Sequence, residues 1–166
     1  RSRGLGDVYK RQGLTDSDEL LQISVIDDAG TVLFDSLVRP YFHTEWPEAQ
    51  KVNGITPEMV AGAPYPHELL PQLVEIFSEM SVCIGYNTSF DLGFLDRIGV
   101  PTEHLTVIDV MQMFVDYLNA NGGTHRRASL STCTKYFDYK WEGAAHNTLA
   151  DAKATLYCYN MMKIIK

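Results

Sequence analysis

The sequence predicts an α/β domain with a central mixed β-sheet flanked by helices, and three observations lead to this fold class. From Glu19 to Arg39, apolar and polar residues alternate as they do in a β-hairpin. After Pro66, helical periodicity alternates with short apolar stretches, which favours parallel strands joined by helices. The chain has 166 residues, of which 45% are hydrophobic and 21% are charged, and this is enough for one domain with a proper core.

The first segments are predicted to be a hairpin followed by a long loop. Leu21, Ile23 and Val25 alternate with polar residues, and Asp27-Asp28-Ala29-Gly30 supplies a turn. Residues 40–63 contain several prolines and are expected to form a loop with short helical turns.

The rest of the chain is expected to alternate helices and strands. Apolar residues at spacings of three and four predict amphipathic helices, and short β-branched stretches predict buried strands. The expected strands are 82–86 and 105–110. The expected helices are 66–80, a helix entered through 87–95, 111–121, 129–137 and the helix that follows His146.

The last helix follows His146 directly. Asn147 is expected to be its N-cap, because the side-chain oxygen can accept a free backbone N–H of the first turn. Asp151 lies in that first turn, where the helix dipole favours an acid, and it falls off the apolar face. A histidine on a loop beside a carboxylate on a helix suits a proton acceptor next to a metal ligand. The residues predicted to face the core lie on one helix face: Leu149, Ala152, Leu156 and Tyr159.

A second acid, Asp91, lies at the carboxyl end of an apolar strand, within a strand-to-helix turn. In open α/β sheets this edge is where ligands bind. Asp91 and Asp151 are therefore expected to reach one cleft and share a hard cation such as Mg²⁺, with His146 beside it. Asp109 also ends a strand, and we interpret it as a structural acid or as one that supports a ligand. The basic residues either contact phosphates or form a solvated basic face: Arg126, Arg127, Lys135 and Lys140.

Four motifs, in order, resemble those of the DnaQ-like, DEDDh-type 3′–5′ exonucleases. Gly13-Leu14, followed by residues 19–23, resembles the tail of the first motif. Asn53-Gly54-Ile55-Thr56 resembles the family's His-Gly-Ile-Thr turn. Asn87-x-x-Phe90-Asp91 resembles the second motif, and His146-x4-Asp151 resembles the third motif of the histidine subtype. The resemblance covers Gly13 to about Lys163 and implies a ribonuclease H-like fold.

The resemblance also implies a function: metal-dependent hydrolysis of the terminal phosphodiester bond of a nucleic acid, with release of nucleoside monophosphates from the 3′ end. It implies two Mg²⁺ or Mn²⁺ ions in the native parent, with Asp91 and Asp151 as metal ligands and His146 as the general base. Asn87 would shape its turn or meet the substrate backbone, and Leu14 would pack near the terminal base. The implied partners are the 3′ end of DNA or RNA, and a DNA polymerase.

The first motif departs from the family pattern, which is Asp-x-Glu-Thr-x-Gly-Leu. Alignment on Gly13-Leu14 puts Val8 in place of the aspartate and Lys10 in place of the glutamate. Residues 7–12 also read as a translation of GAT-GTG-TAT-AAG-AGA-CAG, the end sequence of transposase-based sequencing libraries. We therefore expect residues 1–12 to be non-native and residues 13–166 to be an exonuclease domain truncated at its N-terminus. A chain without the two acids is expected to be inactive, because a lysine ammonium would repel a divalent cation.

The composition of the chain argues against several classes of protein. The net charge of −7 argues against a domain that holds nucleic acid by bulk positive charge, but not against one that holds a phosphate through cations. No stretch is apolar enough to span a membrane, and no secretory pattern appears. Cys83, Cys133 and Cys158 are widely spaced and are interpreted as buried free thiols, which favours the reducing cytoplasm.

Two other functions remain as alternatives. The first is a non-catalytic module that holds a nucleic-acid end or a polymerase without cutting, which suits a chain that lacks two of the family's acids. The second is an unrelated phosphatase or nucleotide-binding domain, against which the absence of a glycine-rich phosphate loop argues.

Overall fold

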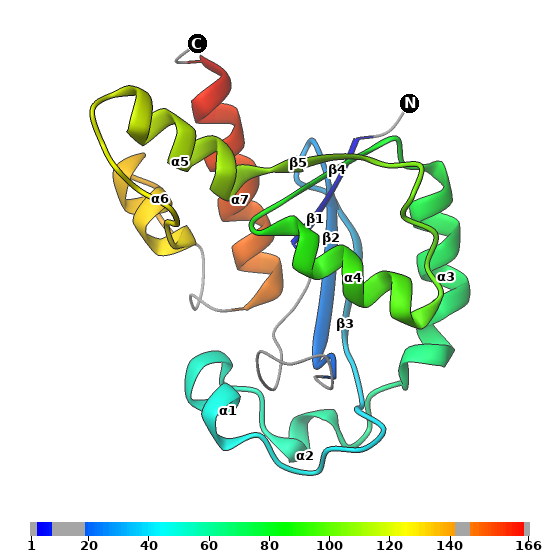
Figure 1. Ribbon diagram of the computed structural model, residues 1–166. Helices are drawn as coiled ribbons and strands as arrows, with labels where there is room; N and C mark the ends of the chain where they lie inside the picture. The colour runs from blue at the N-terminus through cyan, green and yellow to red at the C-terminus, as the bar shows by residue number, and fades with distance from the viewer. Residues whose placement is uncertain (1–2, 8–18, 142–146, 165–166) are drawn as a thin grey trace.

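The computed structural model describes residues 3–7, 19–141 and 147–164, and these residues form a mixed five-stranded sheet with helices on both faces (Figure 1). The strands lie in the order β3-β2-β1-β4-β5. Their bounds are Arg3–Asp7 for β1, Gln22–Asp27 for β2, Val32–Leu37 for β3, Val82–Gly85 for β4 and Thr106–Asp109 for β5.

The helices follow the predicted order closely. Two short ones, α1 (Pro47–Asn53) and α2 (Pro57–Val60), occupy the expected loop. The remaining helices are α3 (Pro66–Glu79), α4 (Thr88–Ile98), α5 (Val110–Ala120), α6 (Leu130–Tyr136) and α7 (Thr148–Ile164). Among the described residues, no helix is long and apolar enough to cross a membrane.

The sheet combines the predicted hairpin with parallel strands. β2 pairs antiparallel with both β3 and β1, whereas β4 runs parallel to β1 and β5 runs parallel to β4. The hairpin turn is held by Asp27, whose carboxylate accepts the backbone N–H groups of Ala29 and Thr31, and Gly30 has φ +83°. The carboxyl ends of β1, β3, β4 and β5 therefore lie at one edge of the sheet.

The central strand comes from the segment that the sequence predicts to be non-native. The backbone of Arg3–Asp7 pairs with β2 on one side and β4 on the other, so these five residues form part of the sheet. Strand pairing uses backbone N–H and C=O groups, which nearly every residue carries, and it does not require an apolar pattern. Whether the segment is native stays a prediction.

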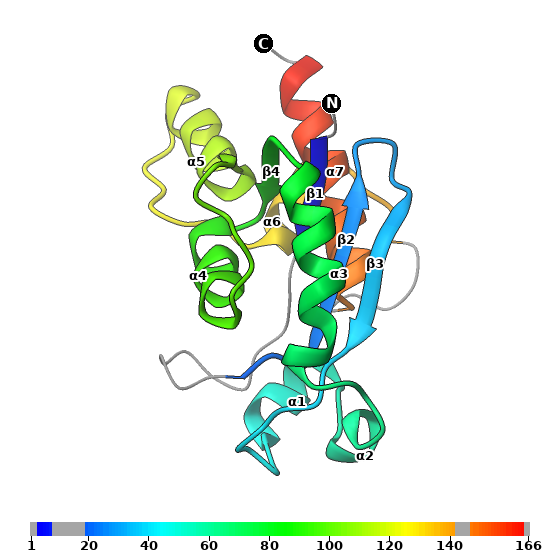
Figure 2. The same cartoon turned by 90° about the vertical axis from the view of Figure 1, so that its right-hand side faces the viewer.

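Both faces of the sheet are covered (Figure 2). α3 and α4 pack over one face together with Ile23 and Val25, while α5, α6 and α7 pack over the other together with Ile26 and Ile84. An alternating strand commonly leaves one face open to water, but residues 21–26 are all buried. The alternation in β2 therefore does not separate a buried face from a solvent face. The polar residues Gln22 and Ser24 are also buried, and both donate hydrogen bonds to Asp35.

One expectation about burial was wrong, and another was confirmed. The strand over residues 105–110 was expected to be buried, but β5 is an edge strand in which Val107 is 44% exposed. The four residues predicted to face the core from α7 do contact it: Ala152 is fully buried, and Leu149, Leu156 and Tyr159 are partly buried and pack against the same cluster. The sheet-facing side of α7 also carries small residues, which allow the helix to approach closely. The residues of α7 that are buried are Thr148, Ala150, Ala152, Ala154, Thr155, Cys158 and Met162.

Candidate active site

The first candidate element is the turn from β4 into α4. Asn87 caps this helix in the left-handed conformation, with φ 64° and ψ 49°, which asparagine tolerates better than most residues. Asp109, at the end of β5, accepts the backbone N–H groups of Asn87 at 3.0 Å and Thr88 at 3.1 Å. The same carboxylate accepts the N–H of Met111 at 2.9 Å, at the start of α5. Asp109 is therefore the structural acid that we predicted, and it fixes the turn that carries Asn87.

Asp91 lies in the first turn of α4, one turn beyond this capped end. Its side chain is only 8% exposed, although acids are rarely so buried. The helix dipole favours a negative charge at this position, because the first backbone N–H groups point toward the helix start. Asp91 follows the buried strand β4 as predicted, but it lies within α4 and not in the turn between strand and helix.

The second candidate element is the start of α7. Asn147 caps the helix as predicted: its side-chain oxygen accepts the N–H groups of Leu149 at 3.0 Å and Ala150 at 3.4 Å. Asp151 then falls in the first turn and is half-buried. The backbone N–H of Asp151 donates to the carbonyl of Asn147 at 2.9 Å, so the acid sits on regular helix.

A hydrogen-bond chain through the buried Ser24 and Thr148 fastens the start of α7 to the sheet. Ser24 of β2 donates its hydroxyl proton to Asp35 of β3 at 2.7 Å. The hydroxyls of Ser24 and Thr148 are also hydrogen-bonded, and because Ser24 has only one hydroxyl proton, Thr148 is the donor. Both hydroxyl-bearing residues are buried. Asp151 is thus held one turn away from a fixed point on β2.

The two helix starts meet the same edge of the sheet. Ser24, which anchors α7, is the register partner of Asp7 at the carboxyl end of β1. β4, which leads into α4, lies directly beside β1 and parallel to it. Because α4 and α7 cover opposite faces of the sheet, Asp91 and Asp151 approach this edge from opposite sides. The expected spacing of their carboxylates stays a prediction.

Several predicted site residues lie outside the described part of the chain. These are the general base His146, the substrate contact Leu14, and the first-motif positions Val8 and Lys10. Asp7 ends β1 immediately before Val8.

The described residues do not form a complete metal site by themselves. Within residues 3–7, 19–141 and 147–164, no three His, Cys, Asp or Glu side chains are grouped so that they could hold a metal ion. The carboxylates of Asp91 and Asp151 have suitable chemistry, because hard divalent cations prefer oxygen ligands. A complete ligand set would need acids from the first-motif positions.

The four basic residues singled out in the sequence lie at the surface, where both a solvated basic face and a contact with phosphates stay predictions. Arg126, Arg127, Lys135 and Lys140 are all exposed, and Lys140 pairs with Asp138 at 2.5 Å.

The asparagine that replaces the family's histidine in the Asn53-Gly54-Ile55-Thr56 motif has a structural role. Its side chain accepts the backbone N–H of Ile55 at 2.8 Å, and the carbonyl of Ile55 accepts the indole N–H of the buried Trp46 at 2.7 Å.

A mixed sheet with acids in the first turns of two helices at one edge is the arrangement of a ribonuclease H-like domain. The family model described as "Exonuclease", of the RNase T type, matches residues 15–159. The chain therefore belongs to the RNase T exonuclease family, the DEDDh or DnaQ-like 3′–5′ exonucleases. Such enzymes use divalent metal ions. The matched range begins after Val8 and Lys10, so it does not include the two positions at which the chain departs from the first motif.

Curated relatives include three exonucleases. The chain is 27% identical to an uncharacterized exonuclease of Escherichia phage 186, over 87% of this chain and 79% of that protein. It is 34% identical to a putative bifunctional exonuclease/endonuclease of Mycobacterium tuberculosis, over 86% of this chain and 22% of that protein. It is 28% identical to RNA exonuclease 4 of Aspergillus fumigatus, over 89% of this chain and 46% of that protein. The chain thus spans less than half of the last two relatives.

Solved structures show the same fold. Exonuclease X in complex with 5′ overhanging duplex DNA matches with a TM-score of 0.67 and 21% identity, over 96% of this chain and 91% of that chain. The nuclease domain of 3′hExo, a DEDDh family member bound to rAMP, matches with a TM-score of 0.75 and 15% identity, over 99% of this chain and 92% of that chain. At such identities the likeness establishes the fold alone.

Proposed function

We propose that the native parent of this chain is a 3′–5′ exonuclease whose site lies at the edge shared by α4 and α7, with Asp91 and Asp151 as metal ligands. The observation that carries this proposal is the placement of both acids. Each lies in the first turn of a helix whose start is fastened to the sheet, by Asp109 in one case and by Thr148 in the other. Acids that must hold a cation in a fixed geometry need such rigid support.

The proposed reaction is hydrolysis of the terminal phosphodiester bond. Water adds to phosphorus, the bond to the 3′ oxygen of the preceding nucleotide breaks, and a nucleoside monophosphate leaves. His146 would accept the proton of the attacking water. Two Mg²⁺ or Mn²⁺ ions, when bound, would lower the pKa of that water and stabilise charge on the phosphate. Leu14 would pack near the terminal base, and Asn87 would shape its turn or meet the substrate backbone.

The competing proposal is a module that binds a nucleic-acid end or a polymerase without cutting. Two observations favour this module. Val8 and Lys10 stand where the family has two acids, and the family match begins only at residue 15. We propose that it describes the chain as written, whereas the exonuclease describes the parent. Three free, buried cysteines support the further proposal of a reducing cytoplasm.

Metal affinity tests the site directly. Titration with Mn²⁺ should give weak binding to the chain as written and at least about tenfold tighter binding to the Val8→Asp, Lys10→Glu variant, since two anionic ligands are restored. In that restored variant, Asp91→Asn or Asp151→Asn should abolish the gain.

The matched control is Asp116→Asn in the restored variant, because Asp116 is an exposed acid on α5 whose carboxylate accepts the side-chain amide of Gln112 at 2.7 Å. Its Mn²⁺ affinity should not change. If Asp91→Asn and Asp151→Asn also leave the affinity unchanged, the assignment of both acids as metal ligands is wrong.

A further inference from the structure

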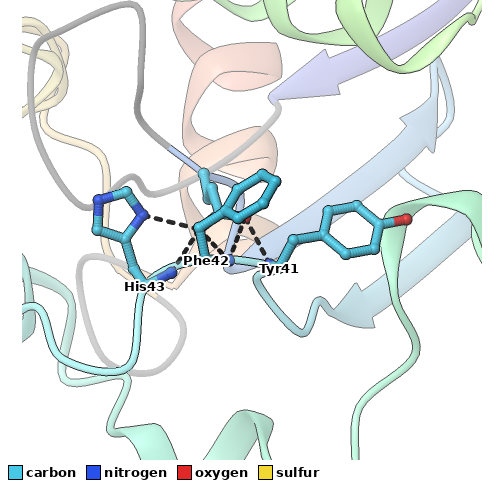
Figure 3. A network of polar contacts seen from close by, with 4 residues as sticks. Tyr41, Phe42 and His43 are labelled. Carbon is cyan, nitrogen blue, oxygen red and sulfur yellow. Dashed lines mark hydrogen bonds and ion pairs between the residues drawn. The ribbon is translucent and has the colours of Figure 1, made fainter.

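An exposed loop after β3 is held in a fixed conformation by one carboxylate. Glu19 accepts the backbone N–H groups of three consecutive residues: Tyr41 at 2.5 Å, Phe42 at 3.0 Å and His43 at 2.8 Å. It also accepts the ring N–H of His43, at Nδ1, at 2.7 Å. Figure 3 shows the three loop residues side by side, with the rings of Tyr41 and His43 directed away from each other.

The charge of Glu19 is maintained at this position. Its burial would raise the pKa of the carboxyl group, but the hydrogen bonds from His43, Phe42 and Tyr41 outweigh burial and hold the pKa below its ordinary value of 4.5. Three successive N–H groups around one anion form a rigid, nest-like backbone. The loop is therefore ordered although its side chains face water.

The side chains that this loop presents are aromatic. Phe42 is 86% exposed, the most exposed large hydrophobic residue in the described part of the chain, and Tyr41 is 48% exposed. The ring of Tyr41 stacks on Tyr65, with centroids 5.1 Å apart and planes 8° apart, and lies 5.9 Å from His67. The guanidinium of Arg39 lies 5.0 Å from the centre of the Tyr65 ring. Rings and a cation are thus combined in one surface.

The loop emerges at the edge of the sheet where the candidate site lies. β3 and β1 are both antiparallel to β2, so their carboxyl ends point the same way. They are separated by two strand spacings, roughly 10 Å. A strand of nucleic acid whose 3′ end lay at the start of α4 and α7 could reach the loop within a few nucleotides.

We propose that Tyr41 and Phe42 form a stacking platform for the bases of single-stranded nucleic acid, upstream of the 3′ end at the candidate site. This inference rests on the proposed function, since the position of the 3′ end sets the path of the strand. Stacking on aromatic rings tolerates any base, because every base has a π-face. Arg39 supplies a local cation for the backbone.

Nucleic acid fits this surface better than a protein partner does. A docking surface for a protein is expected to have a contiguous apolar core. Here Phe42 is followed by His43, Thr44 and Glu45, which are all exposed and polar. The near-parallel rings of Tyr41 and Tyr65, by contrast, have the geometry in which a further flat ring can stack.

The test is the affinity of the whole chain for 5′-labelled oligonucleotides, measured by fluorescence anisotropy with a chelator present so that nothing is cut. Phe42→Ala should weaken binding of a roughly ten-nucleotide single strand by at least about fivefold, the loss expected for one stacked base. It should not change binding of a dinucleotide, which cannot span from the site to the loop. Phe42→Trp should retain the affinity. DNA and RNA probes of one sequence show whether the platform distinguishes the sugar.

The matched control is Ile164→Ala, because Ile164 is 78% exposed and lies at the far end of α7. It should not change either affinity. Equal binding of the longer probe by Phe42→Ala and the unmodified chain would overturn the platform and leave Phe42 available for a protein contact. Failure of the proposed function is a separate outcome. In that case the Val8→Asp, Lys10→Glu variant does not cut a 3′ end, although Phe42 still contributes to binding.

Discussion

At the scale of single residues, acids that are not proposed as metal ligands hold the candidate site and the loop after β3 in place. Asp109 joins three elements, because its carboxylate accepts N–H groups from the turn before α4 and from the first turn of α5. Its position at the end of a strand was enough to predict a structural role. Glu19 was not identified, because its partners lie more than twenty residues away and only the folded chain brings them together.

Asn87 gives a prediction at this scale. Glycine adopts a positive φ without strain, so Asn87→Gly should change the free energy of unfolding by less than about 1 kcal/mol. A β-branched side chain is strongly disfavoured there, so Asn87→Val should cost about 1–3 kcal/mol. Urea denaturation measures both.

The glycine variant also separates the two roles proposed for Asn87. If its side chain meets the substrate backbone, Asn87→Gly should bind oligonucleotides more weakly while its stability is retained. Unchanged binding would restrict Asn87 to shaping the turn. Stability of Asn87→Val equal to that of the unmodified chain would contradict the left-handed turn itself.

At the scale of elements, the sequence pattern located most helices and strands but misjudged what surrounds them. The start of α7 was predicted from Asn147, since an N-cap is a local signal. The apolar face of α7 was predicted as well, although its most buried positions are small residues that the apolar spacing did not single out. Burial of β5 was overestimated, since an apolar stretch does not reveal whether its strand lies at an edge.

The docking of α7 gives a prediction at this scale. Thr148→Val removes the hydroxyl that donates to Ser24 and leaves a buried oxygen with fewer partners, at a cost of about 1–2 kcal/mol in unfolding free energy. Because Asp151 lies one turn beyond Thr148, the Mn²⁺ affinity of the Val8→Asp, Lys10→Glu variant should also fall. Urea denaturation and Mn²⁺ titration measure the two effects.

A buried threonine elsewhere provides the comparison. Thr134 in α6 donates only to the carbonyl of Ser131, at 3.1 Å within the same segment. Thr134→Val should therefore leave Mn²⁺ affinity unchanged, whatever its effect on stability. An equal loss of metal affinity in both variants would mean that the anchoring of α7 does not position Asp151.

At the scale of the whole molecule, the chain has the fold and family of an exonuclease but departs from that family at its first motif. The fold class and the family follow from patterns spread over most of the chain, and for this reason they could be predicted from sequence. The separation of Asp91 and Asp151 could not, because it depends on how two helices on opposite faces approach one edge. The central strand was missed, since pairing through backbone groups leaves little trace in the side chains.

The departure at the first motif is the central claim, and exonuclease activity tests it. With Mg²⁺ or Mn²⁺, the chain as written should release little or no nucleoside monophosphate from single-stranded DNA or RNA, because Val8 and Lys10 replace two anionic ligands. A chelator serves as the control for metal dependence.

The most direct measurement is monophosphate release by the Val8→Asp, Lys10→Glu variant. We predict that this variant cuts from the 3′ end in a chelator-sensitive reaction, and that adding His146→Ala or Asp151→Ala abolishes the activity again. Strong chelator-sensitive cleavage by the unmodified chain would contradict the account, as would a folded double variant that binds Mn²⁺ yet releases no monophosphate.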